Sequence, residues 1–181
     1  DEELAKKALK NNDYFAEIIE RYKEKLCRYL RRLTGFEKQD IEDILQEVFI
    51  KIYRNLNNFD ASLSFSSWAY RITHNEAVNH IKKHKRKYTY ALESDEQDAV
   101  SLTKVLKSDE NVKERAVKKE ESRNIKKILY KLPKKYRDVL VLYYLEDMDY
   151  SEISDILKKP MGTVATLLSR AKQKLKERII N

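Results

Sequence analysis

Only two glycines and two prolines occur among the 181 residues of this chain. Turns between strands depend on these residues, because glycine tolerates positive φ angles and proline fixes a bend. Apolar residues recur instead at the spacing of amphipathic helices. One run, residues 138–145, has strand character, but it is solitary and follows Pro133, a residue typical of helix starts. The sequence therefore predicts an all-α protein.

The last quarter of the chain has the pattern of a helix-turn-helix. A short helix is indicated by the apolar residues Ile153, Ile156 and Leu157. A longer one is indicated by a single apolar stripe: Val164, Leu168, Ala171 and Leu175. Between them, Pro160 disfavours helix at Lys159, and Gly162 is predicted to adopt a positive φ. A tight turn at these residues would join the two helices.

Both helices have predicted caps, and the second has an exposed polar face. Asp149 and Glu152 have the spacing of a capping box, and Thr163 stands where an N-cap is expected. Four polar side chains fall opposite the apolar stripe: Thr166, Ser169, Arg170 and Gln173. Such groups can reach base edges and phosphates from the major groove. A bundle helix that never contacts DNA shows the same pattern and is the alternative.

The net charge of +8 is divided unevenly along the chain. Residues 1–90 hold 18 basic and 14 acidic side chains, residues 91–122 hold 6 and 9, and residues 123–181 hold 14 and 7. The stretch from Glu93 to Asp98 lacks large apolar residues, as a solvated linker does. We therefore predict two small helical domains, 1–90 and 123–181. A flexible acidic linker over 91–122, which includes the start of a connecting helix, would join them.

Three helices are predicted in the first domain, over residues 13–33, 40–56 and 65 to about 87. The second buries one apolar stripe and exposes four side chains on its other face: Asp43, Gln46, Glu47 and Ile50. Its acidic first turn, which includes Asp40, is explained by the positive end of the helix dipole. An exposed isoleucine beside acidic groups indicates a protein contact instead. Both explanations stay open.

The helix that begins at residue 65 has a continuous polar stripe along one face: Arg71, Asn75, Asn79, Lys82 and Arg86. Residues 82–87 include five cations in six positions, which is typical of a solvated or phosphate-facing surface. Asn75 and Asn79 have two explanations. They are either half-buried groups that fasten the helix to its neighbours or contacts to unpaired bases beside aromatic rings. Trp68 is expected in the core.

Two ordered sets of motifs resemble a known family. Residues 40–53, Phe59-Asp60 and the spaced pattern from Phe65 to Asn75 look like region 2 of a bacterial RNA polymerase sigma factor of the extracytoplasmic-function group (group IV). The second set resembles region 4 of the same family and comprises residues 132–142, 151–153, 161–164 and 169–172. Together the two sets account for nearly all of the chain except the linker.

The resemblance implies two roles for the first domain. Region 2 of this family docks on the clamp helices of the largest polymerase subunit, which implies docking residues here at Asp40, Asp43, Gln46, Glu47 and Ile50. Region 2 also opens the minus-ten element by receiving a base flipped from the nontemplate strand. The implied minus-ten residues are Asn57, Asn58, Phe59, Phe65, Arg71, Asn75, Lys82, Lys83 and Arg86.

For the second domain, the resemblance implies recognition of the minus-thirty-five element. The implied residues are Thr163, Thr166, Ser169, Arg170, Lys172, Gln173 and Lys174. The implied partners are core RNA polymerase, through its clamp helices and flap, promoter DNA and an anti-sigma factor. A stand-alone helix-turn-helix regulator that binds palindromic duplex without polymerase is the alternative. That alternative leaves the motifs between residues 40 and 75 unexplained.

The chain departs from the family pattern at three positions. Ala165 and Leu167 stand where many relatives have cations at the start of the recognition helix. Each missing phosphate contact should reduce the salt slope of DNA binding by about one unit. We therefore expect modest DNA affinity from the isolated carboxy-terminal domain and an upstream motif unlike that of its relatives. Asn79 stands where relatives often have Asp, and the consequence of this difference is open.

Sequence signatures of an enzyme are missing. The chain has no His-Glu-x-x-His, no glycine-rich phosphate loop and no Ser/His/Asp order, so a nuclease or transferase is a distant alternative. His80 and His84 fall on one helical face, but no third ligand is expected nearby and neighbouring lysines would repel a dication. We predict no metal and no cofactor.

The expected location is the cytoplasm. A lone Cys27 excludes an internal disulfide framework and fits a reducing compartment. The first residues lack the apolar core of a secretion signal, and no apolar run approaches the roughly 18 residues of a membrane span. We therefore expect no membrane insertion.

Overall fold

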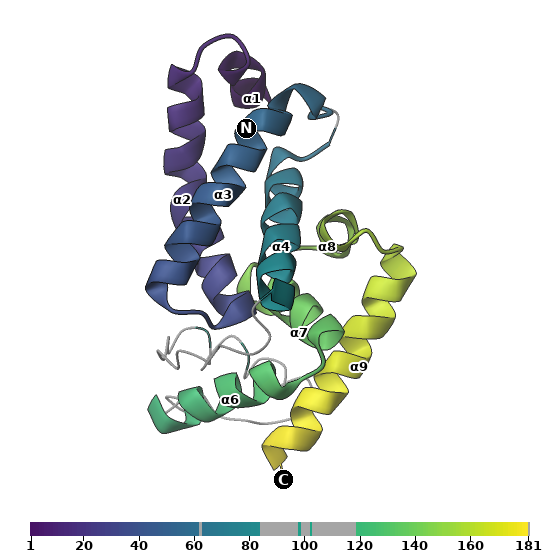
Figure 1. The fold of residues 1–181 in the computed structure, drawn as a ribbon. Helices are drawn as coiled ribbons and strands as arrows, with labels where there is room; N and C mark the ends of the chain where they lie inside the picture. Colours follow the sequence, from purple (N-terminus) through teal and green to yellow (C-terminus); the bar gives the residue numbers. More distant parts are fainter. Residues whose placement is uncertain (62, 84–97, 99–101, 103–118, 181) are drawn as a thin grey trace. The chain divides into compact units, whose positions relative to one another are not determined.

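The computed structural model describes residues 1–61, 63–83, 98, 102 and 119–180, and all regular structure in these residues is helical (Figure 1). The all-α prediction is confirmed. The chain divides into two compact units, one of Asp1–Tyr90 with Asp155–Lys158 and one of Ala91–Ser154 with Lys159–Asn181. Among the described helices, none is long and apolar enough to cross a bilayer.

The first unit contains α1 (Glu2–Ala8), α2 (Asp13–Thr34), α3 (Lys38–Asn55), the short 3-10 helix η1 (Leu56–Asn58) and α4 (Phe65–Lys83). Helices α2, α3 and α4 pack on one another and α1 packs on α2 (Figure 1). The predicted ends of α2 and α3 are correct to within two residues. The described part of α4 ends at Lys83, so the remainder of the predicted helix to residue 87, with Arg86, lies outside the described residues.

Local chemistry explains the end of α2 and the centre of this unit. Gly35 adopts a φ of 69° and its N–H donates to the carbonyl of Arg31 at 2.9 Å, which closes the helix in the manner expected of a C-cap glycine. The core is built on large side chains that are fully buried, including Tyr22, Tyr29 and Phe65. The hydroxyl of Tyr29 hydrogen-bonds Nδ1 of His74 at 2.9 Å, so this buried polar pair is satisfied.

The second unit contains α6 (Lys119–Lys131), α7 (Lys134–Leu140), the π-helical turn η2 (Val141–Leu145), the first part of α8 (Tyr150–Leu157) and α9 (Met161–Ile180). The run 138–145 is therefore helical, as predicted, despite its β-branched and aromatic residues. Helix α9 packs mainly on α7 (Figure 1). The predicted stripe is buried in full: Val164, Leu168, Ala171 and Leu175.

The turn between α8 and α9 differs from the prediction. Gly162 lies inside α9 without a positive φ, and Lys158 takes the left-handed conformation instead, with a φ of 53°. Because the residue before a proline disfavours helix, α8 must end ahead of Lys159, and the chain reverses at Lys158. The N–H of Lys159 donates to the carbonyl of Ser154 at 3.1 Å, as in a Schellman motif.

The cap of α9 is also different from the prediction, whereas the cap of α8 is confirmed. Thr163 lies in the first turn of α9, and its N–H donates to the carbonyl of Pro160 at 2.8 Å, so Thr163 is not the N-cap. Before α8, the N–H of Asp149 donates to Oε2 of Glu152 at 2.9 Å, and the N–H of Glu152 donates to Oδ1 of Asp149 at 2.8 Å. These reciprocal bonds are a capping box.

Two described residues of the predicted linker contradict the expectation of a solvated segment. Asp98 is 3% exposed, with its Oδ2 3.5 Å from Nζ of Lys126, and Leu102 is fully buried. The ion pair with Lys126 offsets part of the cost of burying the carboxylate of Asp98. The rest of the interval before Lys119 lies outside the described residues.

Candidate nucleic-acid and protein interfaces

The predicted docking residues of α3 lie on one exposed face. Asp43, Gln46, Glu47 and Ile50 are all exposed, and Ile50 reaches 50%. Asp40 is half-buried in the first turn, where its charge complements the helix dipole. A large apolar side chain half in water beside carboxylates is typical of a contact surface.

A groove of about 540 Å³ adjoins this face. It lies between α2 and α3 and its lining residues are Ile19, Lys23, Glu42, Leu45, Gln46, Phe49 and Ile50. Two docking residues, Gln46 and Ile50, therefore border an apolar hollow. Sequence reasoning missed Ile19 and Phe49, because a groove between two helices exists only once the helices are packed. The groove favours a protein contact as the explanation of Ile50.

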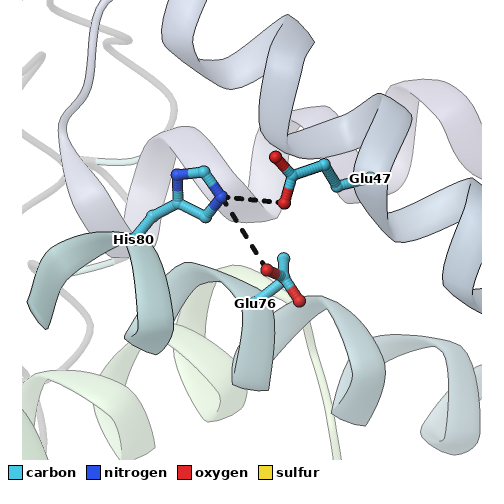
Figure 2. Close-up of side chains that lie close together, drawn as sticks. All are labelled: Glu47, Glu76 and His80. Atoms are coloured by element: carbon cyan, nitrogen blue, oxygen red, sulfur yellow. Dashed lines mark hydrogen bonds and ion pairs between the residues drawn. The ribbon is translucent and has the colours of Figure 1, made fainter. Parts of the chain in front are cut away.

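Behind the docking face, a polar cluster joins α3 to α4 (Figure 2). Nε2 of His80 lies 3.1 Å from Oε2 of Glu47 and 3.8 Å from Oε1 of Glu76, and the side chain of Glu76 is only 4% exposed. Nζ of Lys51 forms an ion pair with the other oxygen of Glu76. The hydrogen bond from His80 lowers the pKa of Glu47 below its ordinary value.

This cluster corrects one sequence expectation. We expected no third metal ligand near His80, yet ligand atoms of Glu47, Glu76 and His80 lie within 4.8 Å of one another. The predicted partner, His84, lies outside the described residues. Nζ of Lys51 forms an ion pair with Glu76, so one of the two carboxylates already has a cation as its partner.

The loop before α4 exposes two amides and one aromatic ring. Asn57 and Asn58 are exposed, and the half-buried ring of Phe59 lies 5.3 Å from that of Phe65 and 5.2 Å from that of Trp68, measured between centroids. Phe65, a predicted minus-ten residue, has no exposed surface, so its ring is covered in this structure. As the first residue of α4 it packs inward, and its ring supports Phe59 from beneath.

Helix α1, which sequence reasoning did not predict, fixes the start of α4. Oε1 of Glu2 accepts the N–H of Phe65 at 2.9 Å, and Oγ of Ser64 accepts the N–H of Ser67 at 3.3 Å. The first turn of a helix leaves such N–H groups without helical partners. The bond from the Phe65 backbone is the main reason that the pKa of Glu2 is lowered.

We therefore expect the stability of the first unit to depend on the ionisation of Glu2. A carboxyl whose pKa is lowered by folding stabilises the folded state above its unfolded pKa, and this contribution is lost as the pH falls through the folded pKa. Glu2→Gln should thus be less stable than the unchanged protein near neutral pH, and the difference should shrink below about pH 4. Urea unfolding at a series of pH values measures this, with the exposed Glu3→Gln as the control. Identical pH profiles for the two variants would refute the role of Glu2.

The polar stripe of α4 is exposed. Asn75, Asn79, Lys82 and Lys83 are exposed and Arg71 is half-buried. The explanation of Asn75 and Asn79 as half-buried fastening groups is therefore wrong. The side of α4 that faces its neighbours uses Thr73, His74 and Glu76 instead. The exposed face can meet a phosphate backbone.

The exposed face of α9 contains five of the predicted DNA residues: Thr163, Thr166, Ser169, Arg170 and Gln173. Two of these side chains have partners on the same helix. Oγ1 of Thr166 donates to the carbonyl of Gly162 at 2.9 Å, and Nε2 of Gln173 donates to Oε1 of Glu177 at 2.9 Å. Such bonds hold the side chains against the helix.

The two remaining predicted DNA residues of α9 lie at the sides of this face. Lys174 is exposed, with its Nζ 5.9 Å from the ring centre of Tyr136. Lys172 is half-buried, with its Nζ 5.4 Å and 5.9 Å from the ring centres of Tyr144 and Tyr143. A hydrogen bond with Tyr144 raises the pKa of Lys172. Cation–π contacts thus hold Lys172 against the second unit and away from the exposed face.

Comparison with known proteins gives a family match in each unit. Residues 18–87 match the Sigma-70 region 2 family and residues 122–175 match the family described as Sigma-70, region 4. The ECF RNA polymerase sigma factor SigW of Bacillus subtilis (strain 168) is 35% identical over 170 residues, which cover 93% of this chain and 90% of SigW.

Two solved structures share the fold. CnrH, in complex with the cytosolic domain of CnrY, superposes with a TM-score of 0.70 at 24% identity over 98% of this chain and 95% of that one. The sigma factor RpoE, in complex with the anti-sigma factor NepR from Bartonella quintana, superposes with a TM-score of 0.65 at 18% identity over 91% of this chain and 96% of that one. With the match to SigW over nearly its full length, these findings identify the chain as a member of the ECF RNA polymerase sigma factor family.

Proposed function

We propose that this protein binds core RNA polymerase, directs it to promoters through a minus-ten and a minus-thirty-five element, and promotes DNA opening. The observation that supports this most strongly is the pairing of two exposed polar faces, on α3 and on α9, with matches to region 2 and region 4. As an initiation factor it supplies binding and positioning, while polymerase performs the chemistry. Its place of work is the cytoplasm.

Docking on polymerase uses the exposed face of α3. Asp43, Gln46 and Glu47 supply polar contacts to the clamp helices of the largest subunit, and Ile50 supplies an apolar one beside the groove. A central apolar contact ringed by polar groups is the usual anatomy of a protein interface. Asp40 sits at the margin of this face and contributes charge.

Opening of the minus-ten element uses the loop before α4 and the exposed stripe of that helix. Extracting a base from the stack costs a few kcal/mol, and stacking on an aromatic ring returns about 1–3 kcal/mol. Phe59 is the aromatic ring of this loop with access to solvent, and Asn57 and Asn58 stand beside it. Arg71, Asn75, Lys82 and Lys83 then hold the strand and the edge of the duplex.

Recognition of the minus-thirty-five element uses the exposed face of α9. Arg170 has the donors for a bidentate contact to guanine, and Thr163, Thr166, Ser169 and Gln173 have groups for neighbouring bases and phosphates. Lys174 flanks this face and serves a phosphate. The flap of polymerase would hold this unit at the upstream element.

We expect Arg170→Ala to weaken promoter binding by the polymerase complex. The loss depends on salt if Arg170 contacts a phosphate, and on DNA sequence if it contacts a base. A lost phosphate contact should reduce the salt slope by about one unit, whereas a lost base contact should cost about 1–3 kcal/mol and relax specificity at one position. Binding of duplex promoters by the assembled complex at several salt concentrations distinguishes the two. Lys127→Ala, an exposed cation of α6, is the control. If Arg170→Ala leaves the salt slope, the affinity and the sequence specificity unchanged, Arg170 is not part of the DNA interface.

We also propose an anti-sigma partner. The similar structure of RpoE contains the anti-sigma factor NepR. In this chain, the half-exposed Ile50 and the groove between α2 and α3 offer apolar surface that a competitor of polymerase could cover. Such a competitor would keep the protein inactive by occupying the docking face.

Run-off transcription tests the proposed function. Core polymerase with this protein should initiate at defined sites in a promoter library, and core polymerase alone should not. The stand-alone regulator predicts instead that the protein binds palindromic duplex without polymerase and leaves initiation sites unchanged. Initiation that does not depend on the added protein would reject the proposal.

A further inference from the structure

The cluster of Glu47, His80 and Glu76 forms a chain of contacts from the buried side of α4 to the exposed side of α3 (Figure 2). At its inner end, the carboxylate of Glu76 is almost completely buried. At its outer end, the side chain of Glu47 is 47% exposed on the docking face. The imidazole of His80, 13% exposed, stands between them. The cluster therefore ties a buried group to a surface that contacts a partner.

Charge compensation fixes the inner end. A buried carboxylate is costly without a partner, and Lys51 supplies one through its ion pair with Glu76. The other oxygen of Glu76 is directed to Nε2 of His80. Lys51 comes from α3 and Glu76 from α4, whereas Glu76 and His80 lie one turn apart on α4, so the imidazole is anchored through Glu76 to the packing of the two helices. Its position does not depend on the surface.

At the outer end, this held imidazole restrains Glu47. A carboxylate accepts hydrogen bonds, so Nε2 of His80 carries the proton in the 3.1 Å contact to Oε2. The same bond lowers the pKa of Glu47, so the side chain stays a carboxylate at neutral pH. A long exposed glutamate otherwise samples many rotamers, and ordering it costs affinity when a partner binds.

We propose that His80 is a positioning residue for polymerase docking, which holds the carboxylate of Glu47 in its binding orientation before polymerase arrives. This inference rests on the proposed function, because it requires Glu47 to contact polymerase. His80 itself lies behind the docking face and needs no contact with the partner. Because His80 already orders the side chain of Glu47, this side chain loses less conformational entropy when the protein binds polymerase.

Binding of the full chain to core polymerase, measured by fluorescence anisotropy, tests the inference with four variants. His80→Ala should weaken binding about three- to tenfold, the range expected for ordering one side chain. His80→Gln, which retains an N–H donor of similar reach, should recover most of this loss. Glu47→Gln should weaken binding by itself, and adding His80→Ala to it should cause no further loss, since the restrained carboxylate is already gone.

The outcomes separate this inference from the proposed function. Glu47→Lys that binds as tightly as the unchanged protein would reject the docking face itself. Normal binding by His80→Ala alongside failure of Glu47→Lys would reject the positioning role alone. An equal loss from His80→Ala with and without Glu47→Gln would show a general structural effect, as would a fall in melting temperature that tracks the affinity. Stoichiometric zinc binding that His80→Ala abolishes would replace the positioning role with a metal site.

Discussion

Phe59→Ala is expected to lose most promoter opening while binding core polymerase as tightly as the unchanged protein. Phe59 presents the accessible ring of the loop before α4, and Phe65 and Trp68 beneath it hold that ring in place. Removing the ring deletes a stacking platform worth about 1–3 kcal/mol, which corresponds to roughly 5- to 150-fold less open complex. The docking face on α3 is left intact. Asn58→Ala should act in the same direction with a smaller effect.

Permanganate reactivity of thymines in the minus-ten element measures this opening. Leu63→Ala is the matched control, because Leu63 is an apolar residue of the same loop that is 42% exposed and has no role in the proposed contact. A template with a preformed bubble should restore transcription by Phe59→Ala, since no base then has to be extracted. Loss of polymerase binding and of opening in equal measure would contradict the assigned role.

Glu47→Lys is expected to have the opposite profile, with polymerase binding lost and the DNA-facing residues intact. The substitution reverses a charge at the docking face and removes the hydrogen bond from His80. Placing a like charge across an interface costs several kcal/mol, which corresponds to about 30-fold or more in Kd. Co-elution with core polymerase on gel filtration and a titration by anisotropy measure the loss.

The control for this charge reversal is Glu24→Lys. Glu24 is an exposed residue of α2, outside the lining of the groove, and its substitution makes the same change in net charge. Long-range steering affects both variants alike, so a difference between them isolates the local contact. If the two variants bind core polymerase with comparable affinity, Glu47 does not contact polymerase.

The helices were predictable because their apolar residues repeat at the helical period over many turns. That signal placed α2, α3, α4 and α9 and identified the exposed faces of α3 and α9. The turn before α9 was not predictable in detail. Pro160 and Gly162 both favour a reversal nearby, but the left-handed residue is Lys158, and a lysine has no sequence signal for that conformation.

Contacts between distant segments were the main part that the sequence did not reveal. Glu2 accepts the backbone N–H of Phe65, and no pattern along the chain relates these two residues. Glu76 falls within α4 as one charged residue among several, and its burial depends on Lys51 from α3. The groove between α2 and α3 likewise requires both helices in place. The spacing of apolar residues predicts which face of a helix is buried, but it does not predict which residue a given side chain contacts.

Two individual side chains differ from their segments. Phe65 was grouped with the minus-ten residues through the family resemblance, yet it is the first residue of α4 and packs inward. Asp98 was assigned to a solvated linker because its neighbours are acidic, yet it pairs with Lys126 and is buried. In both cases the character of the segment did not predict the burial of the individual side chain.

Footprinting on one promoter with the protein alone, core polymerase alone and both together tests the central claim most directly. The claim is that the α3 face attaches the protein to polymerase and that the two units then read two separate elements. Protection of an upstream and a downstream box should therefore appear only when both components are present at physiological salt. Protection of a palindromic site by the protein alone, unchanged by polymerase, would contradict the claim.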